Sequence, residues 1–114
     1  MLPSVNRMRR AEDFATVLRS GARARSGELV VHHAAGLSAE SAPLVGLVVG
    51  RGVGGSVTRH TVSRKLRAQL SARLDRLPVG SGTVVRALPG AGTASSGQLS
   101  SALDAALDRL VGVR

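Results

Sequence analysis

The spacing of apolar positions predicts three helices. The predicted helices cover residues 9–20, 56–77 and 98–111. In the first, Phe14, Val17 and Leu18 recur at the three- and four-residue spacing of an amphipathic helix. The other two carry longer apolar stripes with the same spacing, so each helix has one face that must pack on another element.

Runs of apolar and β-branched residues predict strands between these helices. The predicted strands cover residues 28–34, 44–49 and 82–88, and residues 22–27 form either an edge strand or a loop. Segment 44–49 is nearly all apolar, which is typical of a strand buried on both faces. The element order (α, β once or twice, β, α, β, α) indicates an α+β sandwich, in which helices pack on one small sheet.

A length of 114 residues allows one domain, which we take as residues 1–114. Residues 1–8, ahead of the first helix, are expected to be a loose basic arm. No apolar run is long enough to span a membrane, and the N-terminus lacks the apolar stretch of a signal peptide. The chain has no cysteine, which excludes disulfides and thiolate metal sites. We therefore expect a cytoplasmic protein without a membrane partner.

The net charge of the chain indicates the kind of partner that it binds. Sixteen basic residues stand against seven acidic ones, for a net charge of +9. Such an excess points to a polyanion, with nucleic acid as the leading partner. The alternatives are a basic protein that is merely soluble or one that coats an anionic surface. Phe14 is the only aromatic residue, so affinity should come mainly from arginine and phosphate rather than from base stacking.

The second predicted helix carries the strongest signal for nucleic-acid binding. One side holds an apolar stripe of Val62, Leu66, Leu70, Leu74 and Leu77. The opposite side presents cations, namely His60 (when protonated), Arg64 and Arg67, with Lys65 and Arg76 beyond them. Arg59 lies in the first turn, where its side chain can leave the core. No acid precedes Asp75 on this helix, and unbalanced like charge suggests that an anion offsets it. The alternative is a solvated charged face.

The glycine-rich turn before the second helix carries less weight. Gly50, Gly52 and Gly55 match the dinucleotide fingerprint G-x-G-x-x-G, which keeps a small nucleotide-binding enzyme as an alternative. The acid that should follow on a second strand is missing, because Asp75 falls inside a helix. The same turn could instead approach an RNA phosphate.

Residues suited to catalysis or metal binding do not gather in the sequence. His32 and His33 are adjacent on a strand, so they point to opposite faces and cannot share a metal. Asp104 and Asp108 lie one turn apart on the last helix, where we expect a solvated face. We therefore predict no catalytic and no metal-ligating residues in this chain.

Several segments of the chain together form the pattern of one known family. They are 44–49, Arg51-Gly52-Val53-Gly54, Val57-Thr58-Arg59 with Arg64 and Arg67, Asn6-Arg7-Met8-Arg9-Arg10 with Glu12-Asp13-Phe14, and Val84-Val85-Arg86-Ala87-Leu88-Pro89. Through these segments, and over most of its length, the chain resembles the bacterial ribonuclease P protein subunit. In that family an apolar strand and a basic, glycine-containing turn lead to Arg-Asn-Arg at the start of a basic helix, and the segments occur in the same order.

The chain departs from the family at two places. Arg-Asn-Arg is replaced by Arg59-His60-Thr61, and Ser63 occupies the next basic position. Leu18 and His32 stand where the family's substrate cleft has aromatic residues. RNA affinity is therefore expected to be weaker, or redistributed onto other cations.

The resemblance implies an α+β sandwich with a left-handed βαβ crossover and a function in tRNA 5′ maturation. In that family the RNA subunit, with Mg²⁺ held by RNA and substrate, carries out the hydrolysis. One protein monomer binds one ribonuclease P RNA and contacts the 5′ leader of precursor tRNA. The implied RNA-binding residues are Arg51, Arg59, His60, Arg64, Lys65 and Arg67, with N-terminal contacts from Arg7, Arg9 and Arg10. The implied leader-binding residues are Phe14, Leu18 and His32.

A ribosomal or ribosome-assembly protein remains the main alternative. Such a protein would need only one RNA-binding surface. A ribonuclease P protein would also need a second surface for single-stranded leader, around Phe14 and the central strands.

Overall fold

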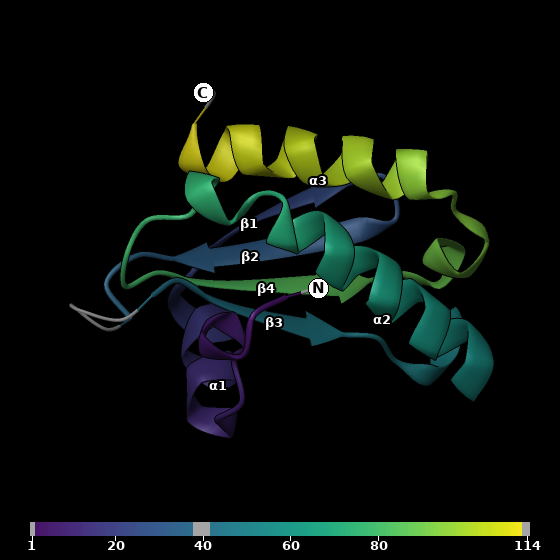
Figure 1. Cartoon of the computed structure of the whole chain (residues 1–114), viewed down its shortest axis with the longest axis horizontal. Coiled ribbons are helices and arrows are strands. Elements are labelled where there is room, and N and C mark those ends of the chain that lie inside the picture. Colours follow the sequence, from purple (N-terminus) through teal and green to yellow (C-terminus); the bar gives the residue numbers. More distant parts are fainter. Residues whose placement is uncertain (1, 38–41, 113–114) are drawn as a thin grey trace.

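The computed structural model describes residues 2–37 and 42–112, which form one mixed sheet with three α-helices (Figure 1). The strands are β1 (Ala22–Ser26), β2 (Leu29–Ala34), β3 (Leu44–Val48) and β4 (Gly82–Ala87). The helices are α1 (Ala11–Ser20), α2 (Ser56–Ser71) and α3 (Ser96–Val111). The strand order is β1-β2-β4-β3, in which only β3 and β4 are parallel. The predicted α+β sandwich is confirmed, and residues 22–27 supply the edge strand β1.

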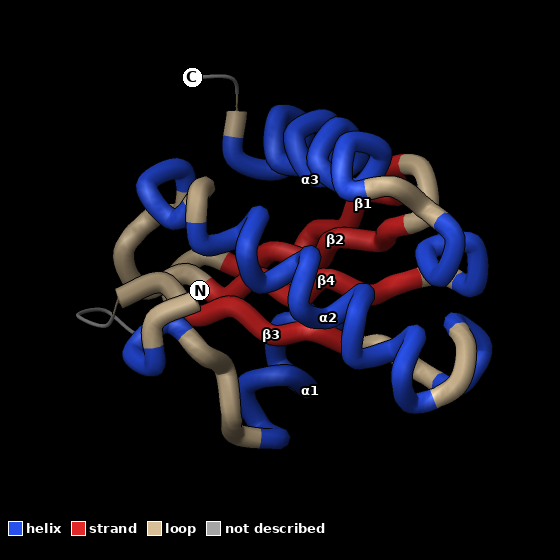
Figure 2. Tube along the Cα trace, turned by 45° about the vertical axis from the view of Figure 1, so that its right-hand side comes forward, coloured by secondary structure: helices blue, strands red, loops and turns tan. Residues whose placement is uncertain are grey.

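Each face of the sheet packs on different helices (Figure 2). Alternate strand residues such as Val31 and Val85 face α2 and α3 and join the larger apolar cluster with Leu66 and Leu103. The other face packs on α1, where Val84 meets a smaller cluster around Val17. The sheet thus separates α2 and α3 on one side from α1 on the other.

The connection from β3 through α2 to β4 is a left-handed crossover. In Figure 1 both strands point to the right, α2 lies on the viewer's side of the sheet, and β4 lies above β3. Nearly all such connections are right-handed, so general rules would have predicted the opposite hand. The handedness agrees with the family resemblance.

Two predicted elements differ from the structure. The helix predicted over residues 56–77 ends at Ser71 and is followed by a 3₁₀ turn at Leu74–Arg76. Leu77 is buried in the core together with the apolar stripe of α2. The helical spacing of apolar residues therefore extends beyond the end of the helix itself. Segment 44–49 forms an edge strand that is only partly buried, although each of its faces contacts an apolar cluster. No helix in the described residues is long and apolar enough to cross a membrane.

The N-terminal segment is packed, so the prediction of a loose arm is wrong for residues 2–8. Leu2 and Met8 are almost completely buried. The Met8 N–H donates to the Val45 carbonyl (2.8 Å), and Asn6 Nδ2 donates to the Pro43 carbonyl (2.9 Å). This segment covers the outer edge of β3, whose backbone groups would otherwise lack partners. Hydrophobic periodicity does not show such an edge contact.

Candidate RNA interface

The glycine-rich turn positions α2. Gly54 has φ +153°, and a Cβ there would lie 2.9 Å from the Thr58 side chain, so the turn requires glycine. Gly55 then precedes the first residue of α2. The turn contains one 3₁₀ segment and leads from β3 into α2. Only one pair of strands in the sheet is parallel, so the turn does not belong to a doubly wound dinucleotide-binding domain.

Burial of the apolar stripe of α2 directs cations away from the sheet. Val62, Leu66 and Leu70 are buried. His60 and Arg64 are exposed on the outer side, and Arg51 is exposed on the turn before the helix. We call Arg51, His60 and Arg64 the α2 ridge.

Two other predicted residues of α2 lie partly inside the protein. Arg59 and Lys65 are half-buried. The Arg59 Nε is buried and has no hydrogen-bond partner among the described residues. Its guanidinium is therefore less available to RNA than that of Arg64.

The helical wheel predicted Arg67 on the same side as His60 and Arg64, but the structure places it elsewhere. It is half-buried and faces a pocket of about 300 Å³ at the outer edge of β3. The same pocket is lined by Phe14, Arg7 and Arg9, together with apolar residues of the N-terminal segment and β3. The structure thus brings together residues that the sequence placed in three separate groups. We call this the N-terminal pocket.

The predicted N-terminal cations have partners within the protein. Arg7 Nε donates to the Leu2 carbonyl (3.3 Å), and Arg9 donates to Ser4 Oγ (2.8 Å). Arg10 forms an exposed ion pair with Glu12 (3.3 Å). Arg7 and Arg9 are held at the pocket, whereas Arg10 is partly neutralised at the surface.

Phe14 lies directly on the backbone of β3. A Cβ added at Gly46 would come within 2.5 Å of two carbon atoms of the Phe14 ring, so glycine allows this close approach. The ring is half-buried in the cluster around Val17 and also lines the N-terminal pocket. Leu18, one turn later on α1, is 40% exposed.

The α1 side of the sheet carries arginines that sequence reasoning missed. Arg23 pairs with His32 across β1 and β2, while Arg25 and Arg86 both lie opposite Val30. Side chains of directly paired residues share a face, so Arg23, Arg25, His32 and Arg86 form one group, the sheet-face cluster. All three arginines are exposed. The alternation Ala22-Arg23-Ala24-Arg25-Ser26 was the signal that could have located two of them.

His32 is the buried member of the sheet-face cluster. The residue is only 4% exposed, and neither ring nitrogen has a hydrogen-bond partner among the described residues. Burial, and then the charges of Arg86 and Arg23, lower the pKa of His32. The imidazole is therefore neutral at pH 7. Its burial shows that the ring itself is not an open stacking surface for a base.

His33 points to the opposite face, as predicted from the strand period. Its Nδ1 lies 2.9 Å from Thr83 Oγ1, and burial lowers its pKa. In the described part of the chain no group of three His, Cys, Asp or Glu side chains is arranged to hold a metal ion.

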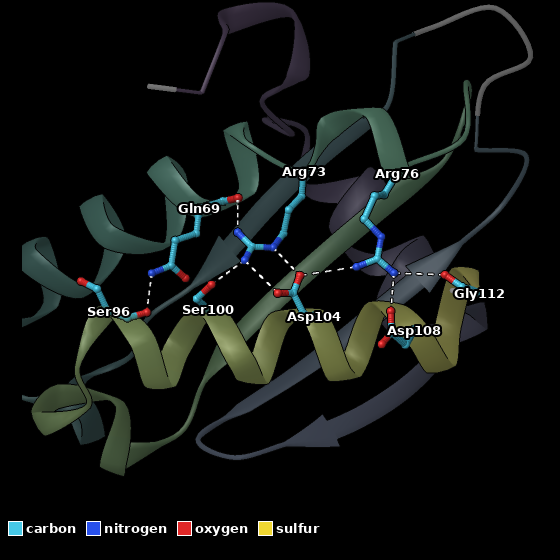
Figure 3. Close-up of polar contacts among 8 residues, drawn as sticks. All are labelled: Gln69, Arg73, Arg76, Ser96, Ser100, Asp104, Asp108 and Gly112. Atoms are coloured by element: carbon cyan, nitrogen blue, oxygen red, sulfur yellow. Dashed lines mark hydrogen bonds and ion pairs between the residues drawn. The ribbon is translucent and has the colours of Figure 1, made fainter. Parts of the chain in front are cut away.

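The two acidic residues of α3 are only half exposed, and both pair with arginines, which the prediction of a solvated face missed (Figure 3). Asp104 accepts from Arg73 Nε (2.7 Å) and lies 3.5 Å from Arg76 Nη1, while Asp108 accepts from Arg76 Nη2 (2.6 Å). The Arg73 hydrogen bond is the main cause of a lowered pKa of Asp104. Arg73 and Arg76 therefore join the segment after α2 to α3, and Arg76 does not project outward beside the α2 ridge.

Comparison with known proteins identifies the family. The family model described as Ribonuclease P matches residues 2–111. The chain belongs to the ribonuclease P protein family. It is thus a protein subunit of ribonuclease P, a tRNA-processing ribonuclease complex, and its partner in that complex is RNA.

Proteins with similar sequences agree with this assignment. The ribonuclease P protein component of Streptomyces bikiniensis is 53% identical, with 98% of this chain and 97% of that protein covered. That of Mycobacterium sp. (strain KMS) is 47% identical, over 96% of this chain and 92% of that protein.

The fold also matches solved ribonuclease P proteins. That of Staphylococcus aureus aligns with a TM-score of 0.81 and 18% identity, over 93% of this chain and 97% of the other. That of Thermotoga maritima aligns with a TM-score of 0.73 and 20% identity, over 95% and 97%. In the described part of this ribonuclease P subunit, exposed basic residues lie on the α2 ridge and on the α1 side of the sheet.

Proposed function

We propose that this subunit binds the ribonuclease P RNA through the α2 ridge and the 5′ leader of precursor tRNA on the α1 side of the sheet. The observation that carries the proposal is the presence of two cationic surfaces on opposite sides of one sheet. Arg67, in the N-terminal pocket, lies between them at the β3 edge. A ribosomal protein would need only one such surface. The subunit acts as a monomer, one per RNA, in the cytoplasm.

In this proposal the RNA subunit, with Mg²⁺ held by RNA and substrate, carries out phosphodiester hydrolysis. Three of the described carboxylates pair with arginines and do not fit a catalytic Mg²⁺ site on the protein. Asp104 and Asp108 are engaged by Arg73 and Arg76, and Glu12 pairs with Arg10. The protein supplies cationic contacts that offset repulsion between the two RNAs, which is the contribution that Mg²⁺ also makes.

The direct test is reconstitution at low Mg²⁺. The purified protein, added to a bacterial ribonuclease P RNA, is expected to raise the rate of precursor tRNA cleavage by at least about tenfold, because its cations replace screening by Mg²⁺. The protein freed of RNA should not cleave. Cleavage is followed by gel analysis of end-labelled precursor. A protein that leaves the rate unchanged, or that cleaves without RNA, would contradict the proposal.

Replacing Phe14 tests the leader surface. Phe14→Leu keeps an apolar side chain over Gly46 but removes the ring that lines the N-terminal pocket. Base stacking is worth roughly 1–3 kcal/mol, so losing part of it should weaken precursor binding by up to about tenfold. Binding of mature tRNA should not change. The measurement is the Kd of the reconstituted enzyme for both tRNAs.

Thermal unfolding of the same variant separates the two functions of the ring. Phe14 also packs in the cluster around Val17, so a modest loss of Tm is expected. Equal losses of affinity for precursor and mature tRNA would show that Phe14 serves packing alone.

A further inference from the structure

A groove of about 1020 Å³ lies beside the start of α3, the helix that packs on the side of the sheet away from α1 (Figure 1). Its other walls are the turn between β1 and β2 and the segment that leads from β4 into α3. Most of the residues that line it are small or polar, among them Gly27, Thr93, Gly97 and Ser101. The residues of the α2 ridge and of the sheet-face cluster all lie outside it. We call it the α3 groove.

The charge of the α3 groove is opposite to that of the whole chain. Among the described residues that line it, Glu28 is the only charged one, although the chain has a net charge of +9. The Glu28 carboxylate takes part in no ion pair or side-chain hydrogen bond within the described residues. An RNA phosphate would be repelled by this carboxylate and would find no arginine or lysine along the described walls to offset the repulsion. The groove is therefore suited to a cation rather than to RNA.

The backbone around Glu28 holds its carboxylate at the groove. Gly27 has φ +54° and turns the chain from β1 to β2, and the Glu28 carbonyl accepts from the Leu88 N–H (2.9 Å). The carboxylate rests on Gly90, where an added Cβ would collide with it, so this position must be glycine. An arriving cation thus meets a carboxylate that is already in place, which lowers the entropy lost on binding.

The lining of the α3 groove favours an extended protein segment over a small molecule. Small-molecule pockets are lined mainly by apolar and aromatic side chains. No aromatic residue is found among the described residues of this groove, and its one large apolar residue, Leu99, is only 1% exposed. The hydroxyl groups of Ser26 and Ser101 can instead donate to or accept from peptide groups. Glycines in the walls allow another backbone to come close.

We propose that the α3 groove binds an extended segment of a partner protein, with an arginine or lysine side chain of that segment against Glu28. The cation forms a charge-assisted pair with the carboxylate, which fixes the register of the segment. The serine hydroxyls bind the backbone on either side of that cation. The proposal does not depend on how the subunit binds RNA, because the groove shares no residue with the α2 ridge or the sheet-face cluster.

The experiment selects short random peptides, displayed on phage, that bind the full chain, with counter-selection on the variant Glu28→Gln. Wild type is expected to enrich peptides that carry an arginine or lysine, although its net positive charge disfavours them. Glu28→Gln keeps the shape of the side chain and removes its charge. It should bind the selected peptides at least about tenfold more weakly in fluorescence anisotropy. Selected peptides without a cation, equal binding to Glu28→Gln, or no enrichment at all would overturn the proposal.

The matched control is Glu12→Gln. It removes the same charge from an exposed residue of α1, on the other side of the sheet. Its affinity for the selected peptides should equal that of wild type. A loss as large as that of Glu28→Gln would mean that the peptides respond to net charge alone, which would overturn the proposal.

A second variant tests the place of binding without disturbing the fold. A Cβ added at Gly97 would meet only Ser95 Oγ, at 3.9 Å, so Gly97→Gln fills the groove from α3. The Tm should stay the same or rise, because glycine is a poor helix former. Peptide binding should nevertheless weaken at least about tenfold, since the space is taken. Unchanged binding would place the peptides elsewhere and contradict the proposal.

Affinity for ribonuclease P RNA separates this proposal from the proposed function. Glu28→Gln and Gly97→Gln should both bind that RNA within about twofold of wild type, because neither residue lies on the cationic surfaces. A tenfold gain with Glu28→Gln would show that the groove faces RNA and would overturn the proposal. Failure of the proposed function looks different, since wild type itself would then give no gain in precursor cleavage while still binding the selected peptides.

Discussion

The double variant Arg51→Ala, Arg64→Ala is expected to bind the ribonuclease P RNA about 100-fold more weakly than wild type at physiological salt. Both side chains are exposed on the α2 ridge, and neither takes part in an ion pair of the described residues. A charge-assisted contact to phosphate is worth about 1.4 kcal/mol or more, which is tenfold per residue.

The dependence on salt shows whether these contacts are to phosphate. Each lost contact should flatten the slope of log K against log salt concentration by about 0.9, so the double variant should lose about two units. The measurement is filter binding or fluorescence anisotropy across a salt series. Thermal unfolding should be nearly unchanged, because exposed substitutions cost little.

A second double variant with the same loss of charge serves as the control. Arg19→Gln, Arg109→Gln removes two exposed arginines that lie outside the α2 ridge. Its binding should weaken far less than that of the ridge variant. Equal losses would mean that the RNA responds to net charge rather than to the ridge.

Much of the fold could be predicted from the sequence because periodicity reports burial. The three helices and three of the four strands were located within a few residues, apart from the end of α2. For β1 the sequence left a choice between an edge strand and a loop. Apolar spacing missed that end because Leu77 remains in the core after the chain leaves the helix. It also missed the packing of residues 2–8, which depends on the unpaired edge of β3. Such an edge exists only once the strand order is known.

The positions of the basic residues could be predicted only where these residues lie on a single helix or strand. The α2 ridge follows from a single helix, so His60 and Arg64 were placed correctly on its outer side. The sheet-face cluster combines β1, β2 and β4, and its register is a tertiary property. Arg67 was misplaced for the same reason, because its surroundings come from the N-terminal segment and α1.

Asp104→Asn is expected to cost about 2 kcal/mol of folding free energy at pH 7, or about 8 °C in Tm. Asp104 joins Arg73 and Arg76, whose side chains are only 14% and 9% exposed, so its removal leaves two nearly buried cations short of a partner. Asp104 itself is 50% exposed, which limits the cost through solvent screening. Asp108→Asn should cost less, because Arg76 keeps Asp104 and the Gly112 carbonyl.

The pH dependence identifies the ion pair as the cause. The pKa of Asp104 is lowered in the folded protein, mainly by the Arg73 hydrogen bond. Its stabilisation is therefore complete above the ordinary carboxyl pKa of 3.8 and is lost as the pH falls through the lower folded value. The gap in Tm between wild type and Asp104→Asn should narrow over that range, and a constant gap would mean lost packing instead. Below the Tm, ribonuclease P RNA should bind the variant and wild type equally, because Arg73 and Arg76 face α3; a large loss of RNA affinity would place these arginines at the RNA after all.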